Sequence, residues 1–184
     1  MPALLRQTIK GFSFFVVAMA LCLFGAAGTI HFWQGWLYLL VFGGCTAAIT
    51  VYLLRYDQAL LARRVNAGPG AEKERTQQVI QAVASLAFLG MLIIPGLDRR
   101  FGWSPVPSEI TWIAAGIVTL SFFVIFLVFR ANSFTSATVE VADGQRVIAG
   151  GPYAVVRHPM YAGAVLLFAA TPPALGSWTG EVSS

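Results

Sequence analysis

Five long apolar runs, separated by short polar segments, make up most of the chain. They lie near residues 11–30, 36–54, 79–97, 109–129 and 160–178. A run of about 20 apolar residues is long enough to cross the hydrocarbon core of a bilayer as an α-helix. The pattern therefore predicts an all-α, polytopic membrane helical bundle. We expect a single transmembrane domain over residues 1–184, with about five transmembrane segments.

Prolines interrupt two of these runs. Pro95 lies near the end of the third run, where we expect it to bend or end the helix. The fifth run begins at Met160 and meets Pro172-Pro173 after only about 18 Å of helix, about half the membrane thickness. We therefore predict that Pro172 and Pro173 break the last segment, with a kink or a re-entrant turn near Thr171.

The first run has two possible interpretations. It follows Arg6 and Lys10, as a secretory signal does, but it is longer than the ~7–15-residue apolar core of a signal peptide. We interpret it as a retained transmembrane helix, and cleavage after Ala27 is the alternative.

In the second run, Gly43 and Gly44 are each followed four residues later by alanine, a spacing that allows close helix approach.

Residues 55–78 form the most charged segment, and they include Gly68-Pro69-Gly70. Apolar residues near its start, among them Leu60 and Leu61, favour a helical extension along the membrane surface, with arginines reaching lipid phosphates. A solvated connector is an equally good interpretation of the same residues.

Composition places the chain in the membrane class. It is 57% hydrophobic and 11% charged, with a mean hydropathy of +0.72. The net charge is +4, but the basic residues are spread over several loops, which argues against a nucleic-acid surface. Cys22 and Cys45 both lie in apolar runs and show no metal-ligand spacing, so neither a disulfide framework nor a metal site is supported.

The distribution of lysine and arginine predicts the orientation of the chain. One side of the membrane has 2 lysines and arginines before the first span, 5 in residues 55–78 and 3 in residues 130–159. The other side has no lysine or arginine in the first turn and 2 in the third loop, so the two sides carry 10 and 2 basic residues. The positive-inside rule therefore places the N-terminus and the loop before the fifth run in the cytoplasm.

Residues 150–163, hereafter the motif segment, are the polar stretch that leads into the fifth run. Pro159 suits the first turn of a helix, and the amides that follow it would form an anion site strengthened by the helix dipole. Arg157 adds a planar, charged fork of donors that suits a carboxylate or a phosphate.

Three further side chains extend the chemistry of the motif segment. His158 adds a polar group, and Tyr153 and Tyr161 provide aromatic faces for a purine or for a cationic centre such as a sulfonium. These residues suit a ligand with one acidic end and one flat or cationic end. A structural hinge whose Arg-His pair holds lipid headgroups explains the same residues equally well.

The motif segment contains Gly151-Pro152-Tyr153, Val156-Arg157-His158-Pro159, Tyr161 and Gly163. This pattern resembles the signature of the isoprenylcysteine carboxyl methyltransferase family and its relatives among the membrane phospholipid methyltransferases. Asn132-Ser133-Phe134 before the motif and Leu175-Gly176-Ser177 after it extend the resemblance to about residues 130–178. The first hundred residues fit the family in architecture only.

The resemblance implies a cytoplasmic cofactor-binding region over residues 130–163 that holds S-adenosyl-L-methionine. It implies cofactor contacts from Gly151, Pro152, Tyr153, Arg157, His158 and Tyr161, with Arg157 and His158 as candidate catalytic residues. In the family, a C-terminal segment with a glutamate pair and further tyrosines and arginines completes the pocket. Glu181 is too isolated to represent that segment, so we expect one wall of the pocket here.

The resemblance implies S-adenosylmethionine-dependent methylation of a lipidic or lipid-attached substrate in the bilayer, with carboxyl methylation as the first expectation. A carboxylate is already ionised at neutral pH and needs no obligatory base, whereas an amine would need deprotonation, for which His158 is the candidate. Two alternatives stay open: an NADPH-dependent membrane reductase of the sterol-reductase type, and a non-catalytic, truncated membrane protein.

Overall fold

The computed structural model describes residues 2–65, 75–104, 106–131 and 151–178, and within these ranges the only regular secondary structure is helical. The helices are α1 (Pro2–Ala27), α2 (Trp33–Tyr56), α3 (Gln58–Val65), α4 (Arg75–Phe101), α5 (Ser108–Ala131), α6 (Pro152–Val155) and α7 (Pro159–Ala174). The all-α prediction is confirmed.

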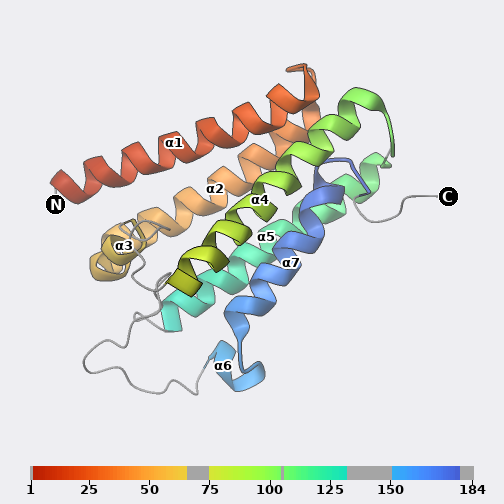
Figure 1. The fold of residues 1–184 in the computed structure, drawn as a ribbon. Helices are drawn as coiled ribbons and strands as arrows, with labels where there is room; N and C mark the ends of the chain where they lie inside the picture. Colours follow the sequence, from red (N-terminus) through yellow and green to blue (C-terminus); the bar gives the residue numbers. More distant parts are fainter. Residues whose placement is uncertain (1, 66–74, 105, 132–150, 179–184) are drawn as a thin grey trace.

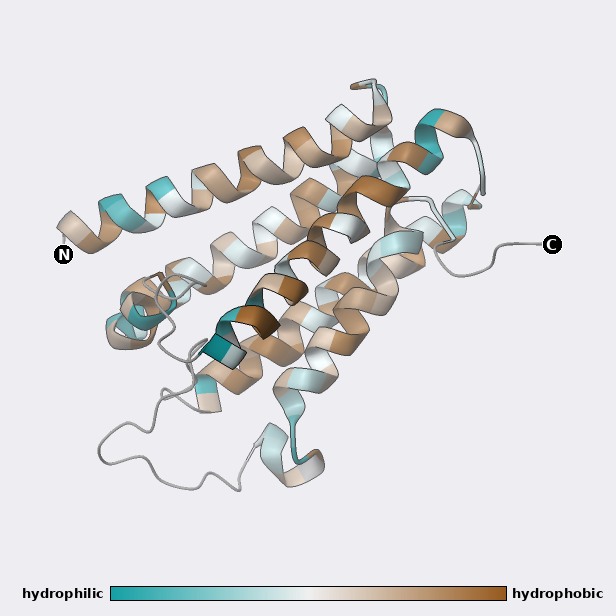
Figure 2. Cartoon of the chain, viewed as in Figure 1, coloured by the Kyte–Doolittle hydropathy of each residue, from teal (hydrophilic) through white to brown (hydrophobic). Residues whose placement is uncertain are grey.

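Among the described residues, four helices are long and apolar enough to cross a membrane. They contain the candidate spans Ala3–Ala27, Trp33–Tyr56, Gln78–Phe101 and Ser108–Ala131. Figure 2 shows apolar residues along the middle of these helices and polar residues gathered toward their ends. Large apolar side chains such as Phe14 (76% exposed) and Leu40 (72% exposed) face outward, as lipid-facing residues do. The chain is therefore an integral membrane helical bundle.

The five longest helices form a closed ring. Going round it, α1 packs on α2, α2 on α5, α5 on α7, α7 on α4, and α4 back on α1. The largest interfaces are α5 with α7 and α1 with α4. The start of α1, helix α3, the end of α5, helix α6 and the start of α7 all lie toward one end of the bundle, which we call the motif end (Figure 1).

Two glycines permit the closest helix contacts. A Cβ on Gly96 of α4 would lie 2.8 Å from the Leu23 carbonyl oxygen of α1. A Cβ on Gly163 of α7 would lie 2.9 Å from Cγ1 of Ile125 of α5. By contrast, no atom lies within 4 Å of a Cβ built on Gly43 or Gly44, so the close helix approach that their spacing allows is not used.

Neither Pro95 nor the Pro172-Pro173 pair ends its helix at once, and α7 ends one residue after Pro173. Helix α4 continues past the buried Pro95 to Phe101. Helix α7 continues through Thr171, Pro172 and Pro173, and ends at Ala174. The φ angle of proline is itself compatible with a helix, and the lost donors affect only the last turn of α7. The chain then turns at Gly176, whose φ is +74°.

At the end of the bundle opposite the motif, Asp98 accepts hydrogen bonds from two other segments of the chain. The backbone amide of Ser104 donates to Asp98 Oδ1 at 2.8 Å, and the hydroxyls of Ser104 and Ser177 both donate to Oδ2. Asp98 is only 4% exposed, and such a carboxylate is stable only when its oxygens are hydrogen-bonded. The chain after α7 is therefore held against the end of α4.

Candidate functional site

The described part of the motif segment begins with a glycine-dependent turn. Gly151 has φ +62° and ψ −131°, a conformation that side chains rarely tolerate, and it is the N-cap of α6. Pro152 follows in the first turn of α6, where its missing amide costs no hydrogen bond. Helix α6 packs on α5, and a Cβ on Gly151 would lie 3.7 Å from Ala131 Cβ. The turn thus holds the start of α6 near the end of α5.

Three residues separate the end of α6 from the start of α7. Val156 is extended, His158 is the N-cap, and Pro159 occupies the first turn of α7. The amide of Ala162 donates to the His158 carbonyl at 3.2 Å. Pro159 is buried, which anchors the start of α7 in the bundle.

The structure brings three of the predicted site residues together at the start of α7. Arg157 and His158 are exposed, and Tyr161 is 70% exposed. The rings of His158 and Tyr161 have centroids 5.7 Å apart. The imidazole of His158 makes no side-chain capping bond, although its residue is the N-cap. Pro152 and Tyr153 are half-buried one short helix away.

This arrangement suits an anionic group. The first amides of a helix have no carbonyl partner within the helix, and the helix dipole favours negative charge there. Arg157 adds a guanidinium beside the same helix start. The side chains of Arg157, His158 and Tyr161 are all exposed, so these groups lie on the surface of the bundle. Residues 132–150 and Glu181 lie outside the described residues.

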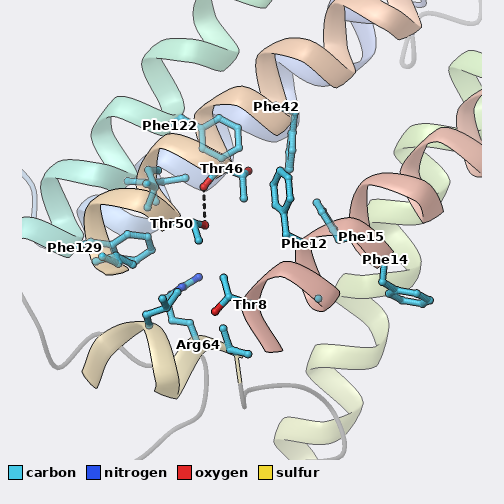
Figure 3. Close-up of a pocket in the computed structure, with 16 residues that line it drawn as sticks. Thr8, Phe12, Phe14, Phe15, Phe42, Thr46, Thr50, Arg64, Phe122 and Phe129 are labelled. Atoms are coloured by element: carbon cyan, nitrogen blue, oxygen red, sulfur yellow. Dashed lines mark hydrogen bonds between the residues drawn. The ribbon is translucent and has the colours of Figure 1, made fainter. Parts of the chain in front are cut away.

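A cavity of about 570 Å³ near the motif end was not predicted from the sequence. It is lined by residues of α1, α2, α3 and α5, including Thr8, Phe42, Arg64 and Phe122 (Figure 3). Arg64 was expected either to reach lipid phosphates or to lie in a solvated connector, but it lines this cavity instead. The spacing of apolar residues in α3 could have predicted this position of Arg64. Leu60 and Leu61 are buried, and Arg64 follows them by four and three residues on the same face of the helix.

Comparison with known proteins bears on the same region. Residues 110–184 match the model of the phospholipid methyltransferase family. The matched residues include most of α5, all of α6 and α7, and every site residue predicted from the motif. The resemblance predicted from the motif is thereby confirmed for this part of the chain. It indicates a membrane methyltransferase.

The phospholipid methyltransferase match does not extend to residues 1–109. No curated protein and no solved structure gave a significant match to the chain.

Proposed function

We propose that this chain is an S-adenosyl-L-methionine-dependent methyltransferase that acts on a lipidic or lipid-attached substrate at the membrane surface. One observation carries the proposal: Arg157, His158 and Tyr161 are exposed together at the start of α7. This cluster lies at an end of the bundle, where a water-soluble cofactor and a membrane-embedded substrate can meet. It also lies inside the region that matches the phospholipid methyltransferase family.

The residues of the cluster fit the chemical groups of the proposed cofactor. Arg157 and the first amides of α7 suit its carboxylate, and the aromatic faces of Tyr153 and Tyr161 suit its purine or its sulfonium. The backbone of Gly151 and Pro152 would form the adjoining edge. When bound, the cofactor supplies an electrophilic methyl group. The part of the chain is to bind, orient and partly desolvate the reacting groups.

A carboxylate is the first candidate for the methyl acceptor. It is ionised at neutral pH, and its attack on a sulfonium cancels charge in the transition state. A carbon–oxygen bond forms as the carbon–sulfur bond breaks, so no proton has to move. Arg157 and His158 would then act by orienting the charged groups.

An amine is the second candidate for the methyl acceptor. An amine must lose a proton to become nucleophilic, and His158 would take it as a general base. The imidazole of His158 is exposed and is not used in capping α7, which leaves it free for that role.

We further propose that the motif end faces the cytoplasm. Arg6 and Lys10 lie near the start of α1, and Arg63 and Arg64 lie in α3 at the same end. The positive-inside rule supports this orientation. Soluble cofactors such as S-adenosylmethionine are made and kept in that compartment.

Calorimetric titration of the purified chain in lipid nanodiscs tests the proposal. We expect binding of S-adenosylmethionine, at least tenfold weaker binding in Arg157→Ala, and unchanged binding in Arg99→Ala. Arg99 is the matched control because it is exposed at the opposite end of the bundle. Binding of NADPH without S-adenosylmethionine would favour the reductase alternative. If the chain binds neither, and Arg157→Ala alters only stability, the non-catalytic alternative holds.

A further inference from the structure

The cavity near the motif end is large enough to hold a ligand. Its volume of about 570 Å³ falls within the range of about 300–1,000 Å³ that is typical of small-molecule sites. Figure 3 shows phenylalanine side chains around one part of it and Arg64 with Thr8 around another. None of the six site residues of the motif lines it, so it is separate from the proposed cofactor site.

The polar end of the cavity carries an inward-facing cation. The guanidinium of Arg64 lies 4.3 Å from the centre of the Phe129 ring, and burial lowers the pKa of Arg64. Within the part of the chain that the structure describes, no carboxylate forms an ion pair with Arg64. A buried cation is costly unless an anion pairs with it. An acidic group inside the cavity would therefore stabilise the charge of Arg64.

Two threonine hydroxyls in the cavity wall also lack partners. Thr8 is only 6% exposed, and neither its Oγ1 nor that of Thr46 has a hydrogen-bond partner among the described residues. A threonine in a helix commonly bonds to the carbonyl of the preceding turn, as Thr50 does to Thr46 at 2.8 Å. The free hydroxyls of Thr8 and Thr46 are therefore available to the oxygen atoms of a ligand.

The other end of the cavity is aromatic. Phe42 packs edge-on against Phe122 with centroids 4.8 Å apart, and Phe15 lies 5.8 Å from Phe42. Along α2, the lining runs from Leu53 to Phe42, a rise of about 16 Å at ~1.5 Å per residue. The cavity thus leads from a cationic end near the membrane surface to an apolar end inside the bundle.

We propose that this cavity binds an anionic lipid with a single hydrocarbon chain, with its acidic head at Arg64 and its chain lying toward Phe42. The arginine fork suits a carboxylate or a phosphate equally, so a fatty acid and a lysophosphatidate share the required chemistry. Burial of the chain against phenylalanines provides the apolar part of the affinity. The proposal does not depend on methyl transfer at the motif.

Photochemical labelling of the purified chain in phosphatidylcholine nanodiscs tests the proposal. The probes are hexadecanoate and a lysophosphatidate, each with a diazirine at the end of the chain. We expect labelled peptides around Phe42 of α2 and Phe122 of α5. Hexadecanol with the same diazirine should label these peptides about tenfold less, because it lacks the charge that pairs with Arg64. Equal labelling by the alcohol would overturn the proposal.

Arg64→Gln should reduce labelling by hexadecanoate and by the lysophosphatidate about tenfold, whereas Arg99→Gln should not change it. If only one anionic probe labels the cavity, that probe identifies the natural head as a carboxylate or a phosphate. If neither labels α2 or α5, the cavity is not a lipid site and the proposal is wrong.

A pair of glycine variants separates occupancy from folding. Gly11 lines the cavity and Gly25 does not, although both lie in α1 and neither has an atom within 4 Å of a built Cβ. Gly11→Leu should fill the cavity and abolish labelling, whereas Gly25→Leu should leave labelling intact. Both variants should unfold at similar temperatures. Unchanged labelling in Gly11→Leu would contradict the proposal whatever the outcome of S-adenosylmethionine titration.

Discussion

The hydroxyl of Tyr38 lies 2.9 Å from Oγ1 of Thr171, and both side chains are buried. Thr171 donates its own proton to the Leu167 carbonyl at 2.8 Å, so Tyr38 is the donor in the bond between them. This bond links α2 directly to α7, the helix whose other end carries Arg157, His158 and Tyr161. It therefore helps to fix α7, and with it the candidate site, against the first half of the chain.

Tyr38→Phe removes this bond and leaves the packing of the ring in place. We expect a loss of about 0.6–1.5 kcal/mol of stability, the usual size for a hydrogen bond between membrane helices. Thermal unfolding in detergent measures it as a fall of a few degrees. Tyr56→Phe is the control, because Tyr56 is 70% exposed and should show no change. Equal unfolding temperatures for the two variants would mean that the Tyr38 bond adds nothing.

Gly96→Ala and Gly90→Ala should change stability in opposite directions. Both glycines lie in α4. A Cβ at Gly96 would lie 2.8 Å from a backbone oxygen of α1, whereas a Cβ at Gly90 would have no atom within 4 Å. We expect Gly96→Ala to destabilise the bundle by about 1–3 kcal/mol, because backbone cannot move aside easily. Gly90→Ala should stabilise α4 by up to ~1 kcal/mol through helix propensity. Chemical denaturation distinguishes the two, and a neutral Gly96→Ala would show that α1 and α4 are not in close contact.

Gly151→Ala tests whether the turn before α6 shapes the candidate site. An alanine at φ +62° is strained by about 1–3 kcal/mol, which should displace Pro152 and Tyr153. We expect weaker S-adenosylmethionine binding in calorimetry. Gly102→Ala is the matched control, since Gly102 has φ +67° at the opposite end of the bundle. The turn has no part in binding if the two variants bind the cofactor equally well.

His158→Gln distinguishes the two candidate acceptors. With an amine acceptor, loss of the general base should slow methylation by about 10²–10⁴-fold. With a carboxylate acceptor the base is not needed, and the rate should fall far less. Transfer of a radiolabelled methyl group to an acyl-chain carboxylate and to phosphatidylethanolamine gives both rates. His31→Gln, which changes an exposed histidine at the other end of the bundle, should leave both unchanged.

The sequence by itself determined the class of the protein and the position of its motif. A span of about 20 apolar residues can satisfy its backbone in a bilayer only as a helix, so the four long helices follow from composition and length. The start of α7 at Pro159 also follows from local sequence, because proline fits the first turn of a helix.

The tertiary structure decided which residues face one another. Gly43 and Gly96 both lie within apolar helices, but of the two only Gly96 lies against another helix. Helix contacts depend on the rotation and tilt of each helix, which the periodicity of side chains does not fix. In a chain with apolar residues on every helix face, the pattern does not distinguish lipid-facing from core positions. Arg64 is the clearest case. Its sequence neighbours suggest a surface residue, and only the packing of α3 against α1 and α2, with Phe129 of α5 beside Arg64, places its charge at the wall of a cavity.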